Sequence, residues 1–175
     1  MRTIASTTFT VALAVAILLG RPSIAGQVRA TRNTKHITLI ANPATTTLRL
    51  GHPINVNLTM TNHGSVPFQW EVTNPDTAYK SFDYLLTYEG TKVRTTAFHR
   101  FIKGQSEPGD PMQSPSGGTM LAVIAPGASV SFTIDINKLY ELTQSGTYTL
   151  LASHRDDSTG SVIRSEPIHV VIESE

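Results

Sequence analysis

The stretch "LTQSGTYTLLASHR", residues 142–155, carries the pattern that decides the fold. Tyr148 and Leu150 begin a run in which every second residue can face a core, which is the period of a half-buried strand. Gly146, two residues before the tyrosine, permits a sharp change of chain direction. A buried Tyr148 ring needs a partner for its hydroxyl, and we expect a backbone group near Leu142. The stretch therefore predicts a strand that leaves a tight corner.

Similar short segments follow one another along most of the chain. Between Ile54 and Met60 every second residue is apolar, which is the clearest alternation in the sequence. Turn residues separate the segments, and no amphipathic helix stands out. The sequence thus predicts an all-β, antiparallel sandwich of about eight or nine strands, of the Greek-key type. The segments lie at 36–41, 46–50, 54–62, 66–73, 81–88, 93–101, 119–125, 129–136, 147–154 and 165–173.

Two connections have their own signals. Residues 89–92, "EGTK", read as a hairpin turn that leads into the segment at 93–101. The corner before residue 146 has room for one helical turn near Lys138–Leu142.

Four residues are predicted to form the centre of the core: Leu58, Trp70, Tyr148 and Leu150. An immunoglobulin domain places a tryptophan and a corner tyrosine at similar positions relative to its two disulfide cysteines. This chain has no cysteine. The two leucines would then fill the space that the disulfide occupies elsewhere.

Three stretches carry a resemblance to a family. They are "INVNLTMTNHGSVPF" (54–68), "IAPGASVSFTIDI" (124–136) and "LTQSGTYTLLAS" (142–153). Together they resemble bacterial secreted immunoglobulin-like modules, and in outline they are similar to the bacterial intracellular proteinase inhibitor family. The resemblance covers about residues 52–172 and implies an immunoglobulin-like sandwich with a binding or inhibitory role.

The first 25 residues read as a secretory signal peptide. Arg2 precedes an apolar run at 9–19, and small Ser23 and Ala25 precede the expected cleavage site. An uncleaved membrane anchor is the alternative. Cleavage near Ala25 would leave a flexible lead at 26–34 and one domain at 35–174, in a secreted or periplasmic protein without an integral membrane span.

The composition excludes several function classes. The chain has 14 Lys and Arg against 13 Asp and Glu, without the basic cluster that nucleic-acid binding requires. The lack of cysteine excludes disulfides, thiol nucleophiles and zinc–thiolate sites. The six histidines are scattered, and no catalytic or nucleotide-binding motif occurs. Asp156 and Asp157 fit a solvated turn better than a calcium loop. We expect no metal, no cofactor and no enzymatic activity.

The segment from Arg100 to Gly118 is the best candidate for binding. Long connections without periodicity are uncommon in compact domains and are often functional. The alternative is an insertion without a partner. We expect a module that engages another protein, or a secreted proteinase inhibitor that presents residues 103–118; the partner and the oligomeric state stay open. The candidate contact residues are Arg100, Lys103, Pro108, Pro111, Met112 and Pro115.

Overall fold

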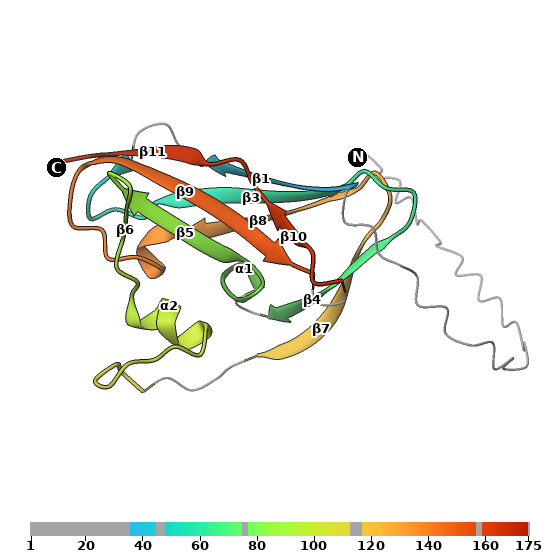
Figure 1. Cartoon of the computed structure of the whole chain (residues 1–175), viewed down its shortest axis with the longest axis horizontal. Helices are drawn as coiled ribbons and strands as arrows, with labels where there is room; N and C mark the ends of the chain where they lie inside the picture. Colours follow the sequence, from blue (N-terminus) through green and yellow to red (C-terminus); the bar gives the residue numbers. More distant parts are fainter. Residues whose placement is uncertain (1–35, 45–47, 75–76, 113–116, 157–158, 175) are drawn as a thin grey trace, which may run out of the picture. The chain divides into compact units, whose positions relative to one another are not determined.

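Strands form most of the described part of the chain. The computed structural model describes residues 36–44, 48–74, 77–112, 117–156 and 159–174. The prediction of an all-β protein is confirmed there, and the strands form three sheets (Figure 1). The expected signal peptide at 1–25 and lead at 26–34 lie outside the described residues. None of the helices in the described ranges has the length and apolarity to cross a bilayer.

The first sheet has the strand order β1–β3–β8 and is antiparallel throughout. Its central strand β3 has alternating exposure because every second side chain points to the core. Val56, Leu58 and Met60 are fully buried. On the opposite face, hydroxyls of β3 and β8 pair across the strands, as between Thr59 and Ser131 at 3.0 Å. The bounds are β1 Ile37–Pro43, β3 Asn55–Asn62 and β8 Ser129–Asp135.

The second sheet is built around β9, the strand that the decisive stretch predicts. β5 pairs with one side of β9, and β10 and β11 share the other side. β6 extends the sheet beyond β5, and β2 runs parallel to β11. The bounds are β2 Leu48–Arg49, β5 Asp83–Tyr88, β6 Thr91–Lys92, β9 Gly146–Arg155, β10 Val162–Arg164 and β11 Ile168–Glu173.

The turn between β5 and β6 has the geometry of a tight hairpin. Glu89 and Gly90 are its two central residues, since Tyr88 pairs with Thr91. Both have positive φ, 48° and 78°. This combination matches the twist of a two-residue hairpin. The hairpin turn predicted at 89–92 is thus present.

The third sheet is a ribbon of two antiparallel strands, β4 (Phe68–Asn74) and β7 (Gly118–Ile124). We call it the β4–β7 ribbon. Phe68, Trp70 and Val72 are buried on one face of β4. Most of β7 is exposed. In Figure 1, β7 lies on the outer side of β4, and no strand pairs with its far edge among the described residues.

The strand predicted at 93–101 was wrong. β6 ends at Lys92, and residues Ala97–Ile102 form the helix α2. Thr96 caps this helix, because its side chain accepts a hydrogen bond from the His99 amide at 3.1 Å. The segment is too short for its helical period to stand out, so the threonines before it favoured a strand.

Two other short helical pieces lie next to the sheets. Helix α1 spans Thr77–Lys80, in a stretch expected to be a turn. A 3-10 helix spans Ile136–Lys138, capped by the Asp135 carboxylate, which accepts from the Asn137 amide at 3.1 Å. The helical turn expected at 138–142 therefore lies slightly earlier, directly after β8.

Trp70 connects the ribbon to both large sheets. Its ring lies edge-on to Phe132 of β8 at 5.6 Å and to His154 of β9 at 5.2 Å between centroids. Phe82, which precedes β5, packs on the same ring at 5.6 Å. Buried residues of all three sheets belong to one hydrophobic cluster. The indole thus stands where the layers meet.

His154 fills the core beside Trp70 at the cost of one unpaired nitrogen. Its Nδ1 donates to the Ser81 carbonyl at 2.8 Å. Its Nε2 and the Trp70 Nε1 are buried without a hydrogen-bond partner among the described residues. Aromatic edge contacts stabilise both rings there.

Tyr148 closes the corner before β9. Its side chain is buried, and its hydroxyl donates to the Gln144 carbonyl at 2.7 Å, two residues beyond the expected position of the acceptor. The Tyr88 ring packs against it at 4.9 Å between centroids. Leu58 and Leu150 are fully buried in the same cluster.

Gly146 makes the corner possible. Its φ is +139°, and a Cβ at this position would lie 2.8 Å from the Tyr88 Cε2. Side chains rarely adopt this backbone conformation, and the Tyr88 ring could not stay in place. Position 146, two residues before Tyr148, therefore requires a residue without a side chain.

Gly146→Ala should destabilise the fold by about 2–6 kcal/mol, because backbone strain and overpacking each cost about 1–3 kcal/mol. Urea unfolding measures this loss. Gly127→Ala is the matched control: its φ is +74°, and no atom lies within 4 Å of the added Cβ. An equal loss in the two variants would show that the Tyr88 contact contributes nothing.

Candidate functional site

Arg100, one of the predicted contact residues, forms its hydrogen bonds with other residues of this chain. It lies in α2 with its side chain 9% exposed. Its guanidinium donates two hydrogen bonds to the Asp110 carboxylate, one of them from Nε at 2.9 Å, and a third to the Thr95 carbonyl. Arg100 therefore closes the base of the following loop and does not present its charge to a partner.

Lys103, at the end of α2, is also engaged internally. Its Nζ donates to the Phe82 carbonyl and to the Asp83 carboxylate, each at 2.8 Å. A longer contact of 3.4 Å reaches the Lys80 carbonyl. The ammonium thus holds the end of α2 against the start of β5.

The rest of the predicted segment divides into an exposed and an undescribed part. Pro108 and Pro111 are exposed, and Met112 is fully exposed. Pro115 lies outside the described residues. The accessible loop is thus residues 104–112, and we call it the α2 loop. It begins and ends next to the Arg100–Asp110 pair.

The Arg100–Asp110 pair shifts the acidity of both groups. The hydrogen bonds from Arg100 lower the pKa of Asp110 to about 2, and the bond from the Glu107 amide, 2.9 Å long, adds to this effect. The same hydrogen bonds raise the pKa of Arg100. Glu107 lies 3.8 Å from the guanidinium and is 60% exposed, so it contributes less. The pair stays ionised at any physiological pH.

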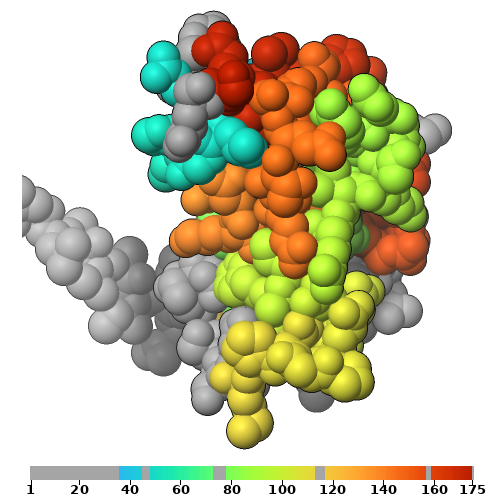
Figure 2. Space-filling model, turned by 90° about the vertical axis from the view of Figure 1, so that its left-hand side faces the viewer, coloured from blue at the N-terminus to red at the C-terminus, as the bar shows by residue number. Residues whose placement is uncertain are grey.

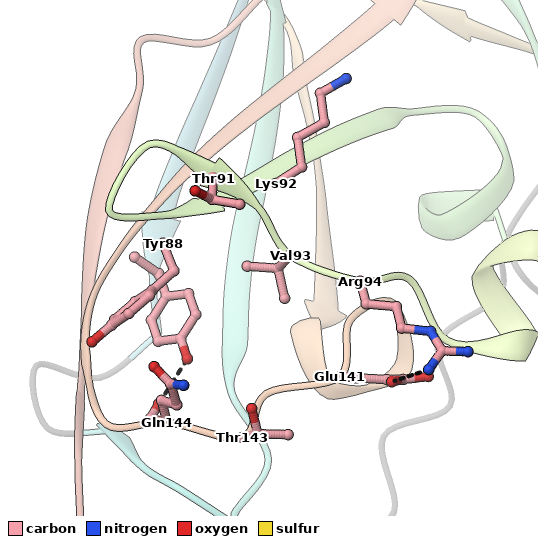
Figure 3. A pocket seen from close by; sticks show the side chains of 9 residues that line it. Tyr88, Thr91, Lys92, Val93, Arg94, Glu141, Thr143 and Gln144 are labelled. Atoms are coloured by element: carbon pink, nitrogen blue, oxygen red, sulfur yellow. Dashed lines mark hydrogen bonds and ion pairs between the residues drawn. The ribbon is translucent and has the colours of Figure 1, made fainter.

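A pocket of about 340 Å³ opens beside the tyrosine corner (Figure 3). We call it the Tyr88 pocket. Figure 3 shows the aromatic rings on one side and the Arg94–Glu141 ion pair, 3.7 Å between Nη1 and Oε2, on the other. Both charged side chains are largely exposed. The pocket's lining includes Tyr88, Val93, Arg94, Glu141, Gln144 and Tyr148.

A second pocket, of about 260 Å³, lies on the other side of Lys92 and Val93, which line both cavities. We call it the His99 pocket. Figure 2 shows this side of the molecule, with the green segment around residues 85–105 next to the orange segment around 140–150. Two neighbouring hollows therefore share one wall.

His99, Tyr140 and Asp83, three titratable groups of the His99 pocket, have structural partners. The Nδ1 of His99 donates to the Leu139 carbonyl at 3.2 Å, and burial lowers the pKa of this histidine. Burial raises the pKa of Tyr140 to about 12, and its hydroxyl donates to the Tyr84 carbonyl at 2.7 Å. Asp83 pairs with Lys103. His99 and Tyr140 are therefore neutral at pH 7.

The described ranges contain no group of three or more His, Asp or Glu side chains placed to hold a metal ion. Asp156 instead organises the β9–β10 turn, where its carboxylate accepts from the Thr159 hydroxyl at 2.9 Å. Its backbone carbonyl accepts from the Gly160 amide at 2.7 Å. Asp156 is buried, which differs from the solvated turn predicted for it, and Asp157 lies outside the described residues.

The free edge of β7 is the feature that sequence reasoning missed. Met120, Leu121 and Val123 are 58%, 58% and 56% exposed. Val66, 66% exposed, lies near the end of the same ribbon, because the Asn62 amide donates to both the Val66 and Ile124 carbonyls at 2.9 Å. Natural proteins usually protect such edges with charge or proline. The sequence does carry a signal for this edge, because no charged residue occurs from 111 to 134.

Comparisons with known proteins show only distant structural likeness. No protein-family model matches the sequence, and curated proteins yield no significant match. A β-glucosidase from Listeria innocua in complex with isofagomine has a TM-score of 0.39 and 11% identity, covering 79% of this chain and 16% of its own length. A β-glucosidase from Erythrobacter marinus has a TM-score of 0.38 and 11% identity, covering 78% and 15%.

The bacterial hydrophobin BslA has a TM-score of 0.33 and 16% identity, covering 79% of this chain and 96% of BslA. The chain thus spans only a small part of the two β-glucosidases and matches nearly the whole of the hydrophobin. Similarity at this level does not identify a shared function.

Asp110→Asn should weaken the pH dependence of stability between about pH 4 and pH 2. A carboxyl whose pKa falls from 3.8 to about 2 on folding stabilises the protein above its unfolded pKa. This stabilisation is lost as the pH falls through the folded pKa. Urea midpoints at a series of pH values measure it. Glu107→Gln, which removes the more exposed neighbour, should keep the wild-type slope, and an unchanged slope in Asp110→Asn would contradict the assignment.

Proposed function

We propose that the chain is an exported, non-enzymatic module with an immunoglobulin-like, Greek-key sandwich fold, and that it engages another protein. Cleavage near Ala25 would place it outside the cell or in the periplasm. The fold assignment is supported by the Tyr148 hydroxyl, which bonds to the backbone four residues upstream. Trp70, buried between strands of both large sheets, is the second mark of such a domain.

The single observation that carries the binding function is the free edge of β7. Its far side leaves backbone N–H and C=O groups without a strand partner among the described residues. Leu121 and Val123 add exposed apolar side chains on its outward face, and Met120 adds one on the other face. An extended segment of a partner can pair with such an edge through main-chain hydrogen bonds. The partner that fits is therefore an apolar, extended polypeptide strand.

The pockets support a role other than catalysis. His99, Tyr140 and Asp83 each have a structural partner, as described above. General acid–base catalysis depends on groups that can exchange protons with a substrate near neutral pH. Here the ionisable groups hold α2 and the 3-10 helix against β5, which favours a scaffold for a binding surface.

Proteinase inhibition by the α2 loop is the second candidate. The Arg100–Asp110 pair and the bond from the Glu107 amide close the loop at its base. A loop restrained in this way loses little conformational entropy on binding. Pro108 and Met112 are exposed at its surface. A restrained, exposed loop is what a substrate-like inhibitor needs.

Photo-crosslinking tests strand addition at β7. Leu121 is replaced by p-benzoylphenylalanine, and the exported protein is irradiated in cells that make it. We expect a covalent product with a polypeptide, because the edge is in contact with its partner. Val171, 52% exposed on the interior strand β11, is the matched control position and should give no product. No product at position 121, or the same product at both positions, would contradict the proposal.

A panel of secreted proteases tests the second candidate. Excess protein should lower the activity of at least one protease, and Met112→Asp should restore it by placing a charge in the apolar contact. Residual activity at increasing protein concentration measures the effect. Cleavage within residues 104–112 without inhibition would eliminate this candidate and leave the β7 proposal unaffected.

A further inference from the structure

We propose that the polypeptide which pairs with β7 is a second copy of this chain, bound antiparallel about a two-fold axis at Leu121. The inference rests on the proposed function, strand addition at this edge, and names its partner. It would join two β4–β7 ribbons into one four-stranded sheet. Such a contact uses the same surface on both copies, which is the commonest arrangement in dimers.

The edge lacks the devices that keep strands apart. β7 carries no charge and no proline, and uncharged sequence continues on both sides of it from residue 111 to 134. A strand with these properties pairs with other strands or aggregates unless something covers it. Because β7 offers no charge, it cannot select a charged strand by electrostatic attraction. An equally uncharged strand fits best, and every copy of the chain supplies one.

The register follows from the length of the strand. Leu121 is the middle residue of Gly118–Ile124, so an axis there pairs all seven residues. A shift towards Val123 would place Met120 opposite Pro126, which has no N–H to donate. In the central register Met120 faces Ala122 of the second copy, and Thr119 faces Val123. Met120 thus meets a smaller side chain, and no like charges stand opposite each other.

The two faces of the ribbon fit this arrangement. Leu121 pairs with Glu71 of β4 and so lies on the outward face, away from Trp70. In the dimer, Leu121 would meet its own copy there, with Val123 beside it. The two Glu71 side chains would be three strand spacings apart, about 14 Å, where salt screens their repulsion. The outward apolar side chains would thus pack laterally against each other across the new strand pair, and the Glu71 charges would stay in solvent.

Other described edges fit such pairing less well. The outward hydroxyls of β8 at Ser129 and Ser131 already bond to Thr61 and Thr59, at 2.8 and 3.0 Å. β6 has only two residues. β1 exposes Ile40 but ends in Asn42 and Pro43. β7 alone among these edges combines a full strand length with apolar side chains on its outward face.

Light scattering during gel filtration of the exported protein tests the dimer. We expect the mass of two chains, and dissociation on dilution. Leu121→Lys places two ammonium groups opposite each other and should weaken the dimer by about tenfold or more. Val171→Lys is the matched control and should stay dimeric. A wild-type monomer at every concentration, or an open series of larger assemblies, would overturn the proposal.

A disulfide tests the register. Leu121→Cys introduces the sole thiol of a chain that has no cysteine. Opposite residues of an antiparallel pair lie about 4.5–5.5 Å apart between Cα atoms, within disulfide range. Mild oxidation should therefore convert the variant to a covalent dimer, whereas Val171→Cys should stay monomeric on a non-reducing gel. A dimer by light scattering that forms no such disulfide would overturn the β7 pairing.

The two proposals can fail separately. If the isolated protein is a monomer but position 121 crosslinks to a different polypeptide, the second copy is excluded and strand addition stands. If position 121 crosslinks to nothing and the protein is a monomer, both are excluded. A crosslinked product with twice the mass of the chain supports both.

Discussion

The burial of Trp70 is the interaction on which the rest of the structure depends. The indole belongs to β4, yet its ring neighbours come from β8 of one large sheet and β9 of the other. Aromatic side chains bury large areas and lock neighbours by edge contacts. Without disulfides, this packing must supply the cohesion between layers. The cluster also explains why a buried histidine with an unpaired nitrogen is accepted beside it.

The tyrosine corner places the surface features around the second sheet. Tyr148 and Gly146 fix the start of β9, and the Tyr88 ring packs into the space that the glycine leaves. That contact positions the β5–β6 hairpin, and the hairpin leads into α2. Arg100 and Lys103 then hold α2 and its loop from inside. The charged side chains of Arg100 and Lys103, which we expected to contact a partner, thus stabilise the fold instead.

The two strands of the β4–β7 ribbon differ in their surroundings, because β4 packs into the core and most of β7 is exposed. Trp70 anchors β4 in the core, so the ribbon is held firmly on one strand. β7 packs mainly on β4 and presents its other edge and its apolar side chains outward. A rigid strand with a free edge needs little reorganisation to accept a partner. The uncharged edge of β7 departs from the usual protection of edges by charge or proline, and this departure supports the binding role proposed above.

The sequence by itself determined the all-β character, the strands at 54–62 and 147–154, and the absence of disulfides, because alternation and composition are local properties. The strand predicted at 93–101 was wrong, because a six-residue helix is too short to show its period in the sequence. Only the tertiary structure decided that Arg100 binds Asp110 and that β7 is an edge. Arg100 and Asp110 are 10 residues apart in the chain, but the sequence does not show that the loop between them folds back to join them. β7 pairs with β4, which is distant in the chain, and strand neighbours of this kind are set only by the tertiary fold.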